Sequence, residues 1–180
     1  MGSLAFIVES MQIRIARKED YSQIYRLVKV AFETAEVSDG KEQDFVLALR
    51  KGENYLPDLE LVAEQEGELI GHIQFTRFPI VDGEDIRALL LAPLCVKQKA
   101  RKKGVGGALI KEGFRRAKDK GYKAVFLVGN PRYYGRFGFR QAETFGFRNV
   151  SGIPNTFVLA CELERGTLDG SRGEIRFPEA

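Results

Sequence analysis

The sequence contains few of the residues that metal sites and disulfide frameworks require. Its 180 residues include two cysteines, one histidine and no tryptophan. Cys95 and Cys161 each lie inside an apolar run of the kind that forms strands, which is typical of buried, reduced thiols. His72 is the lone imidazole and no Cys/His cluster occurs, so the sequence predicts no metal site.

Long apolar runs are absent as well. No stretch of about 18 apolar residues is present to span a membrane, and residues 4–8 are too short and too poor in basic flanks for a secretory signal. The sequence therefore predicts a cytoplasmic protein with no membrane partner. Residues 1–10 have the composition of a disordered or tag-like tail, whereas residues 11–180 suit a single domain.

Positive charge is concentrated in one place. The formal net charge is +3, and nearly all of the local excess falls at residues 97–103. These residues belong to the stretch LCVKQKARKKGVGGAL, residues 94–109, which is apolar at its start, basic in its middle and rich in glycine at its end. A helical pattern follows the glycines. This order predicts a strand, an anion-binding turn and a helix.

The predicted turn has the features of a phosphate-binding site. The first amides of a helix lack intrahelical acceptors and carry partial positive charge, so they bind anions. Glycines at 104, 106 and 107 let a diphosphate approach these amides, and Arg101 offers a planar fork of donors. A nucleotide-triphosphatase loop is excluded because Ala108 follows Gly107 where lysine is required, and the glycine spacing does not fit GxGxxG.

Periodicity and turn residues predict the elements around this stretch. We expect strands at 12–16, 59–65, 69–78, 85–96, 123–128 and 157–163, and helices after residue 20, at 41–50 and at 104–120. Asp20 is the expected cap of the first helix, and residues 166–173 are expected to form a glycine-rich tail. Pro93 lies inside an apolar run that reads as a central strand, where its missing N–H predicts a bulge or a parting of strands.

Two motifs resemble those of the GNAT acetyltransferase superfamily. The sequence Arg101-Lys102-Lys103-Gly104-Val105-Gly106 is similar to its acetyl-CoA signature, Arg/Gln-x-x-Gly-x-Gly/Ala, and Val96 stands where that family ends its fourth strand. Residues 129–139, GNPRYYGRFGF, have the spacing of its tyrosine segment and resemble its YhbS-like branch. The resemblance spans residues 11–164. It implies one α/β (α+β) domain with a mixed, mostly antiparallel twisted sheet, flanking helices and a bulged fourth strand.

The resemblance also implies an activity, the transfer of the acetyl group of acetyl-CoA to a primary amine by direct attack. The strand that ends at Val96 would align the pantetheine arm, and the turn would bind the diphosphate. The expected cofactor-binding residues are Leu94, Cys95, Val96, Arg101, Lys102, Lys103, Gly104, Val105, Gly106, Gly107 and Asn130. Tyr134 is the expected general acid for the leaving thiolate, because its spacing to Gly138-Phe139 selects it over Tyr133.

The sequence leaves several alternatives open. The general base is either a water chain or His72, because residues 90–92 are Leu-Leu-Ala where many members of the family carry a glutamate. Cys95 is an alternative as a covalent nucleophile. The acceptor amine and the oligomeric state are open, with a homodimer among the options. There are two rival functions. One is a non-catalytic CoA-binding protein, and the other is a nucleic-acid binder that uses residues 97–103 as a basic patch. The acetyltransferase prediction itself includes no nucleic-acid partner.

Overall fold

The computed structural model describes residues 11–35, 38–82 and 86–179. The predicted tail at residues 1–10 lies outside them. The described chain forms two compact units. The first unit comprises the described residues up to Gln74 together with Pro93–Gly113, and the second comprises Phe75–Ala92 and Phe114–Glu179.

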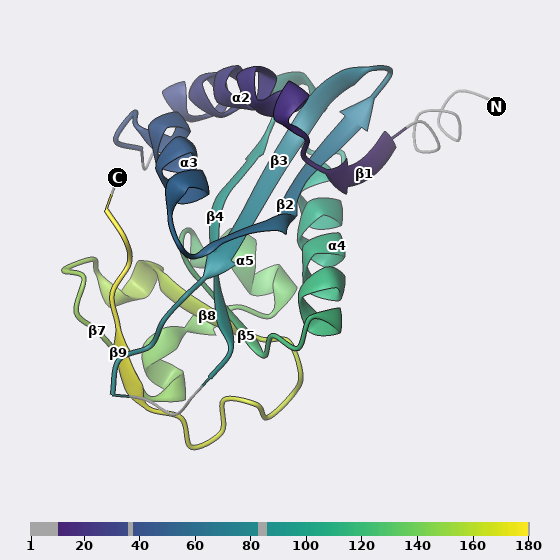
Figure 1. Ribbon diagram of the computed structural model, residues 1–180. Helices are drawn as coiled ribbons and strands as arrows, with labels where there is room; N and C mark the ends of the chain where they lie inside the picture. The colour runs from purple at the N-terminus through teal and green to yellow at the C-terminus, as the bar shows by residue number, and fades with distance from the viewer. Residues whose placement is uncertain (1–10, 36–37, 83–85, 180) are drawn as a thin grey trace. The chain divides into compact units, whose positions relative to one another are not determined.

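The first unit contains the N-terminal strand and two helices that pack together (Figure 1). Its elements are β1 (Met11–Ile15), η1 (Lys18–Asp20), α2 (Tyr21–Glu33), α3 (Glu42–Lys51), β2 (Tyr55–Gln65), most of β3 (Glu68–Arg77), the end of β4 (Ala88–Val96), η2 (Gln98–Ala100) and the first part of α4 (Val105–Asp119). Strand β1 pairs antiparallel with β2. None of the helices in the described residues is long and apolar enough to cross a membrane.

Helix α2 forms because apolar residues recur along one of its faces. Ile24 and Val28 are fully buried on that face, in a cluster with Val62 of β2. Asp20 does not cap the helix with its side chain, contrary to the prediction. Its carboxylate instead accepts two hydrogen bonds from Arg14 of β1, at 2.7 and 2.9 Å. A bidentate arginine is the stronger partner for a carboxylate, so this pair with β1 replaces the side-chain cap of α2.

Strand β4 carries the bulge that Pro93 predicted. The backbone N–H of Phe78 donates to the Ala88 carbonyl, and the backbone N–H of Lys97 donates to the Ile70 carbonyl. Between these two hydrogen bonds, β4 advances by nine residues, from Ala88 to Lys97, whereas β3 advances by only eight, from Ile70 to Phe78. One extra residue is accommodated in β4, which is the definition of a bulge.

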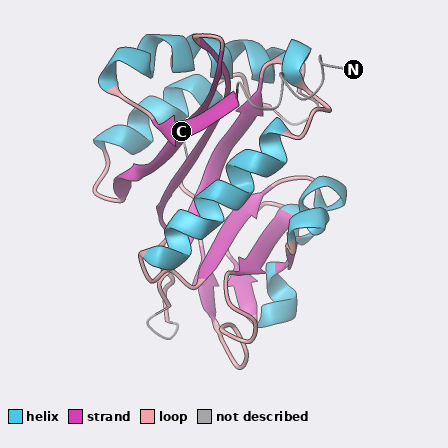
Figure 2. Cartoon of the chain, turned by 90° about the vertical axis from the view of Figure 1, so that its right-hand side faces the viewer, coloured by secondary structure: helices cyan, strands magenta, loops and turns pink. Residues whose placement is uncertain are grey.

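The second unit is organised around one central strand pair. Its elements are the remainder of β3, β4 and α4, followed by β5 (Ala124–Val128), α5 (Pro131–Tyr134), η3 (Gly135–Phe137), β6 (Arg140–Gln141), η4 (Ala142–Phe145), β7 (Phe147–Asn149), η5 (Asn155–Phe157), β8 (Val158–Glu162) and β9 (Gly173–Ile175). Strand β5 pairs antiparallel with β8 along its whole length, and β6 pairs with β8. Figure 2 shows the same helices and strands from the right-hand side of Figure 1.

The pairing of β5 with β4 is parallel and short. It covers only Ala88–Leu90 of β4 and therefore ends before Pro93. This is the parting of strands that the proline predicted as the alternative to a bulge, and β4 has both features. The strands are thus mixed in direction and mostly antiparallel, as the sequence resemblance implied.

The C-terminal segment belongs to the core, which corrects the expected glycine-rich tail at residues 166–173. Strand β9 pairs in parallel with β7, and Glu174 exchanges two backbone hydrogen bonds with Val81. Leu168, Ile175 and Phe177 are buried in an aromatic-rich cluster of the second unit. Local composition indicated a loop because the partners of this segment are remote in sequence.

Ile175→Ala should lower the free energy of unfolding by about 2–5 kcal/mol, because the core cannot close completely around the deleted methyl groups. The matched control is Arg176→Ala at the exposed neighbour, which should stay within about 0.5 kcal/mol of the wild type. Urea denaturation measures both. Equal stability of the two variants would contradict the burial of β9.

Candidate functional site

The predicted anion-binding turn is present between η2 and α4. Lys102 and Gly104 both have left-handed backbone angles, with φ of 62° and 83°. The Gly104 carbonyl accepts the backbone N–H of Ala108 at 3.0 Å. The first three amides of the helix belong to Val105, Gly106 and Gly107. They have no acceptor within the helix, because the residues four positions before them lie outside it. The turn therefore presents backbone donors at the positive end of a 15-residue helix.

A close approach of β3 holds the first turn of α4 in place. A Cβ atom on Gly71 would lie 2.9 Å from Leu109 Cδ1 and 3.0 Å from Val105 Cγ1. Both of these helix residues are buried. Because the strand supplies a glycine here, the helix start can pack directly on the strand backbone. The sequence analysis missed this role of Gly71, whose signal is a lone glycine inside a strand.

The guanidinium of Arg101 donates hydrogen bonds to two backbone carbonyls of the protein. Its Nε donates to the Val96 carbonyl at 3.1 Å, and its Nη2 donates to the Ala31 carbonyl in the last turn of α2, also at 3.1 Å. A cation at the C-terminal end of a helix is favourable because the carbonyls there lack helical partners. The side chain that was expected to offer a fork to phosphate instead ties α2 to the end of β4.

The lysines of the basic stretch fall into two groups. Lys97 and Lys99 both pair with the Glu68 carboxylate. Hydrogen bonds from Lys97 and then from Lys99 lower the pKa of Glu68 to about 2, so this carboxylate stays charged. Lys102 and Lys103 are exposed in the turn itself. Two of the four lysines are therefore held by one carboxylate, which balances one of their two charges, and the other two lysines surround the helix start.

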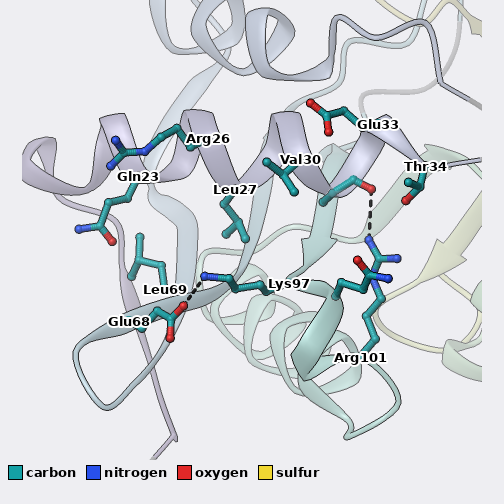
Figure 3. Close-up of a pocket in the computed structure, with 12 residues that line it drawn as sticks. Gln23, Arg26, Leu27, Val30, Glu33, Thr34, Glu68, Leu69, Lys97 and Arg101 are labelled. Atoms are coloured by element: carbon teal, nitrogen blue, oxygen red, sulfur yellow. Dashed lines mark hydrogen bonds and ion pairs between the residues drawn. The ribbon is translucent and has the colours of Figure 1, made fainter.

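A pocket of about 370 Å³ lies beside α2, within the first unit (Figure 3). Its lining comes from Gln23, Arg26, Leu27, Val30, Ala31, Glu33 and Thr34 of the α2 segment, and from Glu68, Leu69, Lys97, Gln98 and Arg101. In Figure 3 the Lys97 side chain reaches Glu68, and Arg101 reaches up to the end of α2. The pocket shares Arg101 with the predicted cofactor-binding residues, whereas the turn glycines do not line it.

The strand segment that ends at Val96 has two unlike faces. Cys95 is buried in the cluster beneath α2, while Leu94 and Val96 on the other face are partly exposed. Burial raises the pKa of the Cys95 thiol to about 12, although Arg101 and a backbone N–H act in the opposite direction. The thiol is therefore protonated at neutral pH and is a poor nucleophile.

The tyrosine segment belongs to the second unit and is tightly packed. The Tyr134 ring lies edge-on to the rings of Tyr133 and Phe139, at centroid distances of 4.9 and 5.7 Å. A Cβ atom on Gly129 would lie 2.5 Å from Tyr134 Cε2, so glycine is required there for the ring to occupy this position. Asn130 caps α5, since its Oδ1 accepts the backbone N–H of Arg132 at 2.9 Å.

Tyr133 has different surroundings from its neighbour. Its ring contacts Phe137, and the Arg136 guanidinium lies 4.7 Å from the ring centroid. Burial raises the pKa of the Tyr133 hydroxyl, and the charge of Arg136 opposes that effect. Apart from the contact between their own rings, the two adjacent tyrosines are held by different neighbours.

A buried ionic cluster in the first unit was not predicted. This Glu60 cluster consists of Glu60, Arg50, Tyr55 and His72. Glu60 Oε1 accepts from Arg50 Nε at 2.9 Å and from the Tyr55 hydroxyl at 2.7 Å. Its Oε2 accepts from Arg50 Nη2 at 2.6 Å and lies 2.8 Å from His72 Nε2. Glu60 and His72 are both 0% exposed, so the candidate base is buried against a carboxylate.

The Glu60 carboxylate remains ionised despite its burial. Burial by itself raises the pKa of a carboxyl group, but the hydrogen bonds from His72, Arg50 and Tyr55 outweigh burial and lower the pKa of Glu60 to about 2. In the sequence, the glutamate looks like the exposed position of an alternating strand. Its partner Arg50 lies on α3 and reaches Glu60 only because α3 packs against β2 in the folded chain.

The predicted residues are distributed over both units. The turn, Leu94–Val96 and His72 belong to the first unit, and Asn130 and Tyr134 to the second. Within the described residues, no group of three or more His, Cys, Asp or Glu side chains is arranged to hold a metal ion.

The chain matches known proteins along most of its length. Residues 12–142 match the family model of the Acetyltransferase (GNAT) domain. The sequence is 38% identical over 172 residues to the uncharacterised N-acetyltransferase YhbS of Escherichia coli strain K12, a match that covers 94% of this chain and 97% of that relative.

Two solved structures are similar to the whole chain. The GNAT family N-acetyltransferase YhbS from Escherichia coli, in complex with CoA, matches with a TM-score of 0.84 and 29% identity over 94% of this chain and 91% of its own. A GNAT family acetyltransferase from Brucella melitensis, in complex with acetyl-CoA, matches with a TM-score of 0.75 and 28% identity over 93% of this chain and 96% of its own.

The Glu60 cluster predicts how stability depends on pH. Because the pKa of Glu60 is lower in the folded protein than its ordinary value of 4.5, its contribution to stability is complete above pH 4.5 and is lost as the pH falls towards about 2. Glu60→Gln should make the free energy of unfolding less dependent on pH in this range. It should also cost about 3–5 kcal/mol at neutral pH, because Arg50 is left buried without its counter-charge.

Glu68→Gln is the matched control for this variant. Glu68 has a pKa lowered to the same range, but water screens its pairs with the two lysines because all three side chains are exposed. Urea denaturation at a series of pH values compares the two. A larger loss in Glu68→Gln than in Glu60→Gln would contradict the assignment of the acid-sensitive charge to the buried cluster.

Proposed function

This chain belongs to the GNAT acetyltransferase family, and we propose that it transfers the acetyl group of acetyl-CoA to a primary amine by direct attack. It is an N-acetyltransferase, and acetyl-CoA is its cosubstrate.

The turn before α4 is the observation that carries the proposal. Left-handed angles at Lys102 and Gly104 bring the chain into the start of a long helix whose first amides have no helical acceptor. Such a start binds a diphosphate through its backbone donors and its dipole. The residues at 101–107 therefore hold the diphosphate of the cosubstrate, and the exposed Lys102 and Lys103 add charge around it.

The end of β4 is the proposed support for the pantetheine arm. The parallel ladder with β5 stops at Leu90, so the backbone groups of Leu94 and Val96 on that edge have no partner from β5. An amide-containing arm can pair with them as a strand would. Arg101 acts in this scheme by fixing the end of β4 to α2, and its backbone forms part of the turn.

Direct attack requires no covalent intermediate on the enzyme. Holding an amine beside an activated thioester converts a bimolecular reaction into an effectively intramolecular one. The raised pKa of Cys95 argues against this thiol as a nucleophile. Tyr134 is the proposed general acid, which gives its hydroxyl proton to the leaving thiolate. Asn130, whose side chain caps α5, contributes by setting the start of the tyrosine segment.

The structure also bears on the rival functions and on the surroundings of the enzyme. Lys97 and Lys99 are paired with Glu68, which weakens the case for a nucleic-acid patch at residues 97–103. Both cysteines are free and buried, which supports a reducing compartment such as the cytoplasm.

Release of CoA thiol across a panel of small-molecule, peptide and protein amines tests the activity and identifies the acceptor class. Binding of CoA without thiol release for any amine would favour a non-catalytic protein.

Gly104→Val should raise the KM for acetyl-CoA by about 10- to 100-fold, the effect of losing one or two hydrogen bonds to a charged ligand. The side chain would project at the turn where the diphosphate approaches, and the KM for the amine should change little. Steady-state kinetics with each substrate varied in turn measures both constants.

Gly170→Val is the control for backbone strain. Gly170 has a left-handed φ of 71° and, like Gly104, nothing within 4 Å of an added Cβ. Valine should therefore strain both positions alike, by about 1–2 kcal/mol. Equal changes in the KM for acetyl-CoA in both variants would argue against a diphosphate at the turn.

Tyr134→Phe should reduce kcat by roughly 10²-fold with little change in the affinity for CoA, because only the proton donor is removed. Tyr133→Phe, the neighbouring control, should be nearly silent. Turnover is measured where the chemical step limits the rate. Wild-type turnover in Tyr134→Phe would exclude the general-acid role.

A glycine pair tests the same role through geometry. Gly129→Ala places a methyl group against the Tyr134 ring and should lower kcat by displacing it, whereas Gly135→Ala enters open space and should not. Equal kcat values for the two alanine variants would show that the ring position does not matter.

A further inference from the structure

Buried polar atoms without hydrogen-bond partners are concentrated on one strand. Among the described residues, four buried side-chain nitrogen or oxygen atoms lack a partner, and three of these belong to His72 and Gln74 of β3. The atoms are His72 Nδ1, Gln74 Nε2 and Gln74 Oε1, and both residues are 0% exposed. Unsatisfied buried polar groups destabilise a fold, so this concentration points to a polar molecule that contacts them during function.

His72 and Gln74 share one face of β3. Gly71 faces α4, since a side chain there would meet that helix. Side chains alternate along a strand, so His72 and Gln74 point to the opposite face. That face is the one on which Arg50 of α3 meets Glu60 of β2. The unpartnered atoms therefore adjoin the Glu60 cluster.

The Glu60 carboxylate determines which nitrogen of His72 carries the proton. An ionised carboxylate only accepts hydrogen bonds, so His72 Nε2 must donate to it across 2.8 Å. Arg50 already balances the charge of Glu60. A neutral His72 then has its lone pair on Nδ1, the atom without a partner. This is the arrangement in which a carboxylate orients an imidazole as a base.

His72 lies next to the strand segment that is proposed to hold the pantetheine arm. The hydrogen bond from the Lys97 N–H to the Ile70 carbonyl sets the antiparallel register of β3 and β4 in this unit. The same register places His72 opposite Cys95, and the backbone N–H of His72 is directed at the Cys95 thiol. One strand spacing therefore separates His72 from the backbone of Leu94–Val96.

We infer that His72 is the general base of the acetyl transfer, with Glu60 as its positioning residue and Gln74 as a hydrogen-bonding group for the acceptor amine. This inference rests on the proposed function. The amine nitrogen forms its bond to the acetyl carbon and loses a proton to His72 Nδ1, directly or through water, while Nε2–H stays bonded to Glu60. The carbon–sulfur bond breaks, and the departing thiolate takes its proton from the general acid of the reaction. Solvent then restores the two residues, because one has gained a proton and the other has lost one.

The groups around His72 keep their charges through the neutral pH range. The titratable groups that contact His72 or its carboxylate partner are Glu60, Arg50, Tyr55 and Cys95. Tyr21 is one step further out, with its hydroxyl 3.5 Å from that of Tyr55. The pKa of Glu60 is about 2 and that of Cys95 about 12. Burial, followed by hydrogen bonds to Tyr21 and Glu60, raises the pKa of Tyr55, so its hydroxyl stays protonated.

Nitrogen NMR of the tag-free protein tests the tautomer without any activity assay. His72 is the single histidine of the chain, so its imidazole signals need no assignment. In the neutral form of the ring we expect the proton on Nε2, where it is donated to Glu60, and a bare Nδ1. A neutral ring that carries its proton on Nδ1 would overturn the inference.

His72→Gln tests the catalytic role. Glutamine can still donate to Glu60 but is not a base, so kcat should fall by roughly 10²- to 10⁴-fold. The fall of kcat on the acid side of the pH profile should also disappear, while CoA binding stays within about twofold. Val46→Ala removes buried volume from α3 beside the same core and is the control for destabilisation, with an unchanged pH profile.

Gln74→Leu keeps the inference testable if His72→Gln does not fold. Leucine replaces an unsatisfied amide with an apolar group of similar size, so Tm should rise, whereas kcat/KM for the amine should fall at least tenfold. The inference is wrong if a stable Gln74→Leu variant has unchanged kinetics, or if the pH profile of His72→Gln is unchanged. Either result would still be compatible with the proposed acetyltransferase activity. Absence of thiol release by the wild type with every amine would instead remove the proposed function itself.

Discussion

The close packing of α4 on β3 is the contact on which the proposed cosubstrate site depends. Gly71 lets Val105 and Leu109 of the first helical turn rest on the strand backbone, and both residues are buried there. A helix anchored in this way cannot shift along the strand without losing core contacts. Its first amides are therefore fixed before any ligand arrives, and preorganised donors bind a charge without the cost of ordering them.

Charged residues in the first unit are used mainly to hold the protein together. Arg101 joins the end of α2 to the end of β4, and Glu68 gathers two lysines of the basic stretch. Glu60 is ionised in a place where water is excluded, which is tolerated only because Arg50, Tyr55 and His72 satisfy both of its oxygens. The atoms without partners belong to His72, a member of this cluster, and to Gln74, two residues further along the same strand.

Local patterns in the sequence predicted most of the elements correctly. The helices at α2, α3 and α4 follow from apolar residues at helical spacing, and the irregularity of β4 follows from the missing N–H of Pro93. The predictions that failed concern residues whose partners lie on another element of the fold. Asp20 was expected to cap a helix but binds Arg14, and the glycine-rich residues 166–173 lead into a strand that pairs with β7.

The sequence by itself determined the order of strand, turn and helix at residues 94–109 and the spacing of the tyrosine segment, because backbone preference and motif spacing act over a few residues. Only the tertiary structure decided where the charges go. Arg101 meets a carbonyl 70 residues away, and His72 meets a carboxylate 12 residues away on another strand. Such contacts depend on which faces of distant segments come together in the core, and a side chain's own sequence neighbours carry no record of that choice.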